Sequence, residues 1–272
     1  LACVKRAGTL VAGGHRGEAI ALLRQVCVTD DEPLGCSALA RTLHAEGAPD
    51  RQAVAEVAER ALAGWARRCQ AEEWAACVYL GKDIDALAHD AENAFAAFDL
   101  ACAHDQGDGC AEAGTYAQDG AGTPRDRAGA IQRYIRGCEL MSATGCFYLG
   151  LALQDGQGTD VRLDETRAVA SFAAACELGE LRGCNNYGLA LEEGRGIARD
   201  PAAAVKVYVA ACDAGHGRAC HNVGTAFEEG TGVAVDLRAA YAAYVRGCER
   251  GAGTACQRAG YLREMGIGVA VD

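Results

Sequence analysis

Cysteine is the residue type whose number and spacing could carry chemistry in this chain. Fifteen of the 272 residues are cysteines, and twelve of them form pairs whose members stand eight residues apart. These pairs are Cys69/Cys77, Cys102/Cys110, Cys138/Cys146, Cys176/Cys184, Cys212/Cys220 and Cys248/Cys256. Cys27 and Cys36 form a seventh pair that is one residue wider, and Cys3 is left over. Paired thiols of this kind can close disulfides, ligate a metal ion or act as nucleophiles.

Disulfides explain the pairs best. Each pair brackets a short loop between two helical patterns, where antiparallel helix ends lie close enough for a bridge. Closing so short a loop stabilises the fold by roughly 2–3 kcal/mol per bridge. Seven such bridges would have no use in a reducing cytosol, so the sequence predicts a periplasmic or extracellular protein. Cys3 fits the place of a second pair member, and Leu1-Ala2-Cys3 also resembles a lipoprotein cleavage box. Whether Cys3 is free, paired upstream or lipidated is left open.

Metal binding and catalysis are less well supported. Structural zinc sites bring cysteines two to four residues apart, and the one local Cys/His cluster here is Cys220 with His216 and His221. A β-lactamase-type nucleophile needs Ser-x-x-Lys, and none of Ser37, Ser142 and Ser171 is followed by that lysine. We therefore predict no catalytic residue, no metal and no other cofactor.

The elements that position the cysteines form a repeat of about 36 residues. We call the helix that begins near the second cysteine the A helix, and the one that ends at the next first cysteine the B helix. Counting back from the first cysteine, alanine recurs eight residues before it and a large apolar residue four before it. Twelve residues before it, aspartate recurs as a predicted B-helix cap, at Asp90, Asp126, Asp164, Asp200 and Asp236.

Glycines complete the repeat. One follows the second cysteine by four residues, where a B helix can pack closely: Gly114, Gly150, Gly188, Gly224 and Gly260. Glycine pairs then end the A helix in left-handed C-caps: Gly120/Gly122, Gly156/Gly158, Gly194/Gly196, Gly230/Gly232 and Gly266/Gly268. Residues 1–89 follow this scheme loosely, with a long helix starting near Asp50 and a polar run over 82–89 in place of the glycine turn.

The recurrent form CxxxGxxxxxGxG, a capping Asp and A-x3-Y/F-x3-C resembles the Sel1-like repeats. The cysteine spacing resembles the disulfide-rich branch typified by the Helicobacter cysteine-rich proteins. The resemblance implies an all-α, α/α right-handed solenoid of about seven repeats, with A helices on the concave face. We expect a single array over residues 1–272, regular over 90–272, with both ends cut through a repeat. Tyr261, Leu262 and Met265 would then be exposed, because the chain is a segment of a longer one or another chain covers the end.

Charge and hydropathy limit the partners. The net charge of −11 and the pI near 5.1 argue against nucleic acid. No apolar run reaches the roughly 18 residues of a membrane span. Acidic residues recur at the ends of A helices and form a solvated row that could attract a basic partner; they are Asp119, Asp155, Glu192, Glu193, Glu228, Glu229 and Glu264.

The residues just after each second cysteine differ between repeats, which favours recognition over structure. The candidate partner-binding residues are Tyr79, Glu112, Tyr148, Asn185, Asn186, His221, Asn222 and Arg258. Asn186 and Asn222 are equivalent in neighbouring repeats, so their amides could clamp an extended peptide; equally, they could face solvent or cap their helices.

The sequence thus predicts a non-catalytic scaffold that binds a protein or peptide on its concave face in the periplasm or extracellular space. The alternative, implied by the resemblance alone, is a penicillin- or peptidoglycan-fragment-binding protein with weak β-lactamase-like hydrolysis. The identity of the partner is left open.

Overall fold

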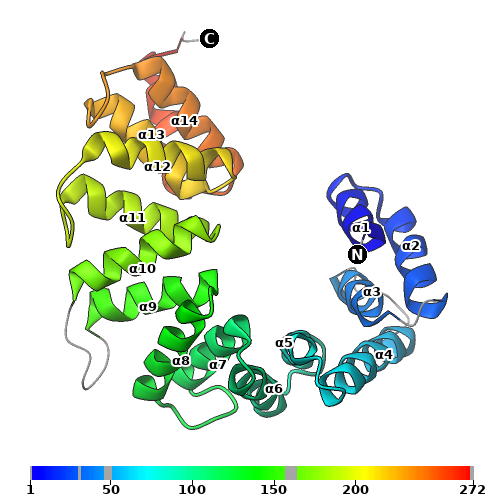
Figure 1. Ribbon diagram of the computed structural model, residues 1–272. Helices are drawn as coiled ribbons and strands as arrows, with labels where there is room; N and C mark the ends of the chain where they lie inside the picture. The colour runs from blue at the N-terminus through cyan, green and yellow to red at the C-terminus, as the bar shows by residue number, and fades with distance from the viewer. Residues whose placement is uncertain (1, 30–31, 46–50, 157–163, 270–272) are drawn as a thin grey trace. The chain divides into compact units, whose positions relative to one another are not determined.

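The computed structural model describes residues 2–29, 32–45, 51–156 and 164–269 (Figure 1). All the regular elements of these segments are helices. The A helices are α1 (Ala2–Ala12), α3 (Pro33–Ala45), α5 (Trp74–Asp83), α7 (Gly107–Asp119), α9 (Ala143–Asp155), α11 (Leu181–Glu193), α13 (Gly217–Glu229) and α15 (Gly253–Glu264). The B helices are α2 (Arg16–Thr29), α4 (Arg51–Gln70), α6 (Ala91–Ala103), α8 (Arg127–Glu139), α10 (Glu165–Glu177), α12 (Pro201–Asp213) and α14 (Leu237–Glu249). Seven A/B pairs and a final A helix confirm the predicted all-α array of helix-turn-helix repeats.

The helices group into two compact units, residues 1–133 (unit 1) and residues 134–272 (unit 2). Within unit 2, α9 to α15 stack in chain order (Figure 1). Some consecutive A helices also touch one another: α1 touches α3 and α5 touches α7 in unit 1, and α13 touches α15 in unit 2.

The predicted B-helix caps are confirmed. In each case the aspartate carboxylate accepts a hydrogen bond from a backbone N–H of the first helical turn, which would otherwise have no partner. The distances are 3.1 Å from Asn93 to Asp90, 2.9 Å from Gly129 to Asp126, 2.9 Å from Arg167 to Asp164, 2.9 Å from Ala203 to Asp200, and 3.0 Å from Arg238 and Ala239 to Asp236.

The glycines of the A helices make room for the B-helix aromatics. A Cβ added to Gly150 would lie 2.6 Å from the Phe172 ring, and one on Gly224 would lie 2.6 Å from the Tyr244 ring. Phe172 and Tyr244 are buried in the resulting space. Gly260 occupies the equivalent place in α15, and a Cβ added there would have nothing within 4 Å.

The glycine turns end four of the A helices as predicted. In α15 the C-cap is instead Met265, in a right-handed conformation, and Gly266 follows it with φ of 64°. Gly120, Gly156, Gly194 and Gly230 are left-handed C-caps with φ of 61–75°. The second glycine of each turn lies against the first turn of the preceding B helix, as Gly232 does against Pro201. Any side chain there would meet backbone, so these glycines also set the spacing between repeats. Gly158 lies outside the described residues.

All seven predicted disulfides are present, with S–S distances of 1.96–2.08 Å. Each joins the end of a B helix to the start of the next A helix. The bridges are Cys27–Cys36, Cys69–Cys77, Cys102–Cys110, Cys138–Cys146, Cys176–Cys184, Cys212–Cys220 and Cys248–Cys256.

Six of the seven A-helix partners of these bridges are buried, and Cys256 is partly exposed. Cys77, Cys110 and Cys146 are at most 1% exposed, so their sulfur atoms are closed to a ligand. Their task is to hold one repeat against the next. Cys3, by contrast, is free and exposed.

The described helices do not combine the length and apolar character that a membrane span needs. In the described parts of the chain, no helix is long and apolar enough to cross a bilayer.

The polar run predicted over 82–89 is instead helical: α5 continues into a π-helical turn, Ile84–Ala88, that ends at a left-handed His89. The cause is Asp83, which is 1% exposed. Its carboxylate accepts hydrogen bonds from Ser37 at 2.8 Å, from Trp65 Nε1 at 3.0 Å, and from Arg41. This buried carboxylate ties α3, α4 and α5 together. The long B helix of the second repeat begins at Arg51, and Asp50 is outside the described residues.

At the C-terminal end the expectation is right for two residues and wrong for one. Tyr261 and Met265 are 45% and 59% exposed, but Leu262 is fully buried in a cluster with Tyr244 and Ala240. The reason is that Leu262 lies on the face of α15 that packs against α14.

Candidate functional site

Each of the eight predicted binding residues is the fifth or sixth residue of an A helix. Unit 1 contains Tyr79 and Glu112, and unit 2 contains Tyr148, Asn185, Asn186, His221, Asn222 and Arg258. Of those in unit 2, the structure brings the three asparagines into contact with one another. Those of unit 1 each contact a different neighbour.

Three asparagines lie next to each other across α11 and α13. Asn222 Nδ2 donates to Asn185 Oδ1 at 2.9 Å, and Asn185 Nδ2 lies 3.5 Å from Asn186 Oδ1. Asn185 is only 8% exposed, whereas Asn186 and Asn222 are half-buried. Asn185 therefore orients its neighbours, and Asn186 and Asn222 keep amide groups for a ligand. Asn185 is the one buried residue among the eight predicted partner-binding residues.

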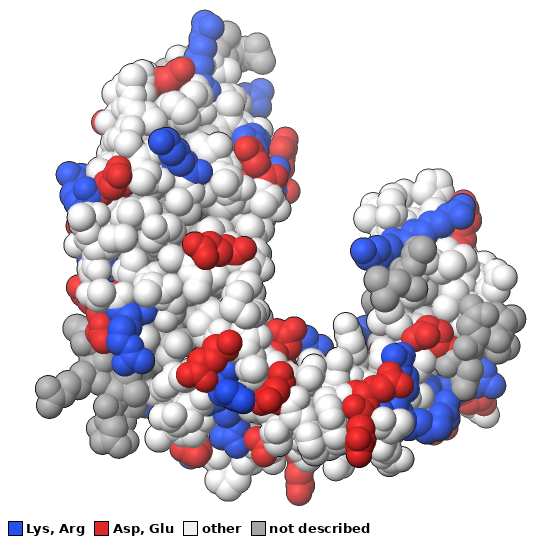
Figure 2. Space-filling view, viewed as in Figure 1, with Lys and Arg blue, Asp and Glu red and all other residues white. Residues whose placement is uncertain are grey.

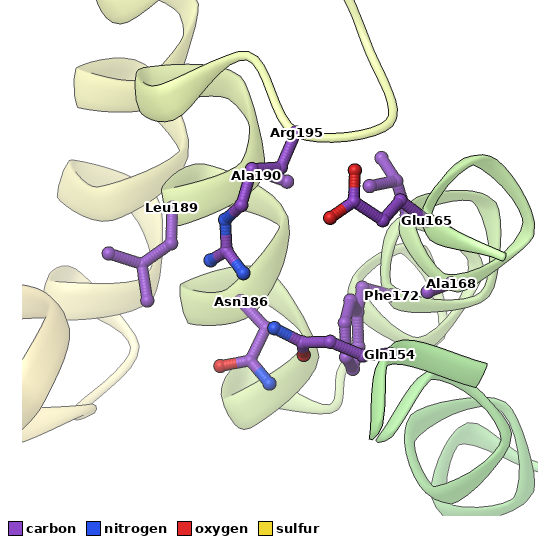
Figure 3. Close-up of a pocket in the computed structure, with 9 residues that line it drawn as sticks. Gln154, Glu165, Ala168, Phe172, Asn186, Leu189, Ala190 and Arg195 are labelled. Atoms are coloured by element: carbon purple, nitrogen blue, oxygen red, sulfur yellow. The ribbon is translucent and has the colours of Figure 1, made fainter. Parts of the chain in front are cut away.

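Asn186 also lines a cavity of about 50 Å³ between α9, α10 and α11 (Figure 3). Gln154 lies beside it, Phe172 forms an apolar wall, and Arg195 and Glu165 stand at the rim. Arg195 also forms an ion pair with Glu193. A cavity of this size holds a group no larger than one or two waters, since a water occupies about 30 Å³ in the liquid.

We call Gln154, Asn185, Asn186 and Asn222 the amide cluster.

A charged group continues the same face onto α15. Glu228 accepts hydrogen bonds from Tyr244 Oη at 2.8 Å and from Arg258 Nε at 2.9 Å. The Arg258 guanidinium lowers the pKa of Glu228, and burial raises the pKa of Tyr244 to about 12. Burial, aided by Arg258, lowers the pKa of His221, whose ring centroid lies 5.3 Å from that of Tyr244. Glu228 thus stays ionised and holds Arg258 in place.

Aromatic contacts surround the remaining predicted residues. Tyr148 stacks on Tyr134 with ring centroids 5.3 Å apart, and the Arg182 guanidinium lies 4.3 Å from the Phe147 ring centroid. In unit 1, Tyr79 stacks on Trp65 at 4.8 Å and is 49% exposed. Glu112 pairs with Lys82 at 3.1 Å. These contacts hold the side chains in fixed orientations, which lowers the entropy lost on binding.

The three serines have structural tasks. Ser37 donates to Asp83, Ser142 caps α9 by accepting from the Gly145 N–H at 3.2 Å, and Ser171 donates to the Arg167 carbonyl at 2.9 Å. All three are buried. In the described segments no three His, Cys, Asp or Glu side chains converge as metal ligands would. The arrangement is suited to holding a ligand by hydrogen bonds and ion pairs.

Sequence reasoning missed Gln154 and Arg195 as site residues and treated Glu192 and Glu228 as part of a solvated row. Both glutamates accept a hydrogen bond at 2.8 Å from a B-helix tyrosine, Tyr208 or Tyr244. A signal for this was present. The repeats with glutamate at this A-helix position carry tyrosine at the aromatic B-helix position, whereas the repeat with Gln154 carries Phe172.

Comparison with known proteins places these features in a family. The Sel1 repeat matches five segments of the chain: 94–117, 108–140, 143–180, 181–216 and 217–251. None of the curated proteins matches the chain. Among solved structures, a protective antigen of uropathogenic Escherichia coli strains with an SLR fold is 20% identical, with a TM-score of 0.70 over 93% of this chain and 53% of that one. This chain therefore spans about half the length of the antigen.

A Sel1 repeat protein from Oxalobacter formigenes is 21% identical, with a TM-score of 0.68 over 85% of this chain and 89% of that one. Cysteine-rich protein B of Helicobacter pylori is 27% identical over 48% of this chain and 92% of that one, with a TM-score of 0.40. The first two likenesses show the fold, an α/α solenoid. Together with the five matched repeats, which cover more than half of the residues, they lead to one conclusion: the chain belongs to the Sel1 repeat family.

Proposed function

We propose that this Sel1 repeat protein is a non-catalytic scaffold that acts outside the cytoplasm and holds an extended segment of a partner protein. The segment lies on the A-helix face of unit 2, across the amide cluster. Sel1 repeats typically serve as protein-interaction scaffolds, which supports the general role. The whole of residues 1–272 is proposed to be one Sel1-like array.

The hydrogen bond from Asn222 to Asn185 carries the proposal. An amide side chain can donate and accept at once, so it can pair with both the N–H and the C=O of a peptide group. Asn222 donates one Nδ2 hydrogen to Asn185. This bond fixes the orientation of the Asn222 amide and leaves its second Nδ2 hydrogen and its Oδ1 for a ligand. Asn186 presents the equivalent amide one repeat earlier. Two oriented amides on adjacent repeats match an extended main chain better than a compact surface.

The neighbouring contacts suit the same ligand. The cavity beside Asn186 has room for a small side chain, and Arg258, held by Glu228, places a guanidinium further along the face. Tyr148 adds an aromatic ring at the other end. The guanidinium carbon of Arg182 lies 5.7 Å from the centroid of this ring. His221 is proposed as a further contact residue of this site, and Tyr79 and Glu112 are proposed separately as partner-binding residues of unit 1. A partner thus meets amides at the centre and charged and aromatic groups on both sides.

Seven disulfides support the proposed location. Local bridges of this number form and persist in the periplasm, the endoplasmic reticulum or the extracellular space. No contact among the described residues favours the weak-hydrolase alternative. The hydroxyl of each serine already forms a hydrogen bond within the fold.

Selection from a random linear peptide library tests the function. The oxidised chain is the target, and selected peptides are then measured against Asn186→Ala, Asn222→Ala and the control Gln132→Ala, which removes an exposed amide from the B helix α8. Each asparagine variant should weaken binding by about tenfold, the equivalent of one lost hydrogen bond to a peptide group. Affinities that are unchanged in both asparagine variants would contradict the proposed site.

A further inference from the structure

A second surface of unit 2 is positively charged, although the chain as a whole is negatively charged. Beside the starts of α11, α13 and α15 runs a groove of about 750 Å³. We call it the basic groove; it is lined by Arg182, His216, Arg218 and Arg250, together with Leu181, Gly215, Gly217 and residues 251–254. Three successive disulfides, Cys176–Cys184, Cys212–Cys220 and Cys248–Cys256, close the loops that form it.

The groove concentrates positive charge on an acidic protein. The chain carries a net charge of −11, yet the lining residues of the groove include three arginines and no aspartate or glutamate. Elsewhere basic and acidic side chains are interspersed, as on the face shown in Figure 2. A local positive surface on a protein of negative net charge attracts anionic groups at short range only.

The three arginines differ in how their charge is compensated. Arg182 is paired with Glu180 through two hydrogen bonds of 2.9 and 2.8 Å. Arg250 lies over a disulfide, with Nη1 at 3.3 Å from Cys220 Sγ, which carries no charge. Arg218 is exposed and, within the described residues, forms no ion pair with a carboxylate. Two guanidinium groups are therefore available to a ligand, and each can bind a carboxylate through two N–H groups.

The main chain and His216 add neutral donors. The helices α13 and α15 begin at Gly217 and Gly253, and their first N–H groups have no partner within the helix. A Cβ added to Gly253 would meet nothing within 4 Å, so the backbone there is open to a ligand. The N–H groups of Gly215 and Gly251 already donate to the Cys212 and Cys248 carbonyls. His216 Nδ1 accepts from the Ala219 N–H at 3.3 Å, which leaves Nε2 as the protonated donor of the neutral ring. Burial and Arg218 lower the pKa of His216 and so keep it neutral at pH 7.

We propose that the basic groove binds the carboxylate side chains of an acidic, extended segment of a partner protein. The spread of Arg182, Arg218 and Arg250 over three successive loops suits several carboxylates along one chain rather than a single small anion. A nucleic acid is disfavoured, because its dense phosphate charge is repelled by the net charge of the protein. The groove contains none of the residues of the amide cluster and meets the first site only at Arg182, which also lies beside Tyr148. It gives the scaffold a second attachment point.

Fluorescence anisotropy with a labelled ten-residue peptide that contains six glutamates tests this inference. The reference is the same peptide with glutamine in place of glutamate. The full oxidised chain should bind the glutamate peptide and not the glutamine peptide. Arg218→Gln and Arg250→Gln should each weaken binding by about tenfold, the scale of one charge-assisted pair. The control Arg238→Gln removes an exposed arginine from the B helix α14 and should leave binding unchanged.

Three results would overturn the inference. They are equal binding of both peptides, an equal loss in Arg238→Gln, and binding of a sulfated oligosaccharide without binding of the glutamate peptide. Thermal unfolding of each variant shows whether it is folded. Asn222→Ala should bind the glutamate peptide normally, and Arg218→Gln should bind the library-selected peptides normally. Failure of the groove is thereby distinguished from failure of the amide cluster.

Discussion

The side chain of Asn222 donates a hydrogen bond of 2.9 Å to that of Asn185, 37 residues earlier in the chain. The bond joins two A helices of neighbouring repeats at the face proposed to bind a partner. Since Asn185 is buried and Asn222 is not, one amide supports the other.

A double-mutant cycle at these two positions measures that support. Asn185→Ala should lower the free energy of unfolding by about 1–2 kcal/mol, because it removes a buried, hydrogen-bonded amide. Asn222→Ala should cost less, because Asn222 is half-buried, and the two losses should be coupled by about 0.5–1 kcal/mol in urea unfolding. Asn186→Ala is the control and should cost under about 0.5 kcal/mol. Additive losses would show that the amides do not act together.

Glycine positions in two A helices offer a matched pair of variants. Gly224→Ala places a Cβ 2.6 Å from the Tyr244 ring, so the repeat must shift and should lose about 1–3 kcal/mol. Gly260→Ala is the same substitution at the equivalent place of α15, where the space is open. It should instead stabilise the chain by up to about 1 kcal/mol, since alanine is the better helix former. Equal effects of the two variants in thermal unfolding would contradict the proposed role of glycine.

Features that recur in every repeat were predictable from the sequence, and single features were not. The capping aspartates, the turn glycines and the cysteine pairs each do one local task at a fixed spacing, so the pattern reveals them. Asp83 was missed because its partners Ser37, Arg41 and Trp65 lie 18–46 residues away on other helices. The burial of Asn185 and the tie between Glu228 and Arg258 depend in the same way on a neighbouring repeat. Contacts that occur once leave no periodic trace in the sequence.

Removal of one disulfide tests the contribution of the cysteine pairs. Cys212→Ala with Cys220→Ala opens a bridge of sequence separation 8 and should lower the free energy of unfolding by about 2–3 kcal/mol. Cys3→Ala, at the free and exposed cysteine, should change it by less than about 0.5 kcal/mol. A double variant as stable as Cys3→Ala would show that the bridge adds nothing.

Acidification should destabilise the protein in two stages. The pKa values of His216 and His221 are lowered by burial and by the neighbouring Arg218 and Arg258, although Glu180 and Glu228 act in the opposite direction. The fold therefore favours the neutral rings, so their contribution is present above pH 6.5, the ordinary value, and is lost as the pH falls below it. Arginine partners lower the pKa values of Glu180 and Glu228, whose contribution is lost below about pH 4.5.

Unfolding in urea at about pH 7.5, 5.5 and 4 measures this dependence, and NMR titration of the imidazole protons assigns it. Both rings should titrate below pH 6.5, and His221→Gln should reduce the loss of stability between the two higher pH values. Stability that rises on acidification, or an imidazole that titrates above its ordinary value, would contradict the assignment.

The side-chain amide resonances of Asn186 and Asn222 test the central claim most directly. A heteronuclear NMR spectrum of the oxidised chain is recorded with and without a peptide selected from the library, and Gln132 serves as the internal reference. The account predicts that the NH₂ signals of Asn186 and Asn222 shift on binding while that of Gln132 stays in place. Peptide binding that leaves both asparagine signals unmoved would show that the partner is held elsewhere.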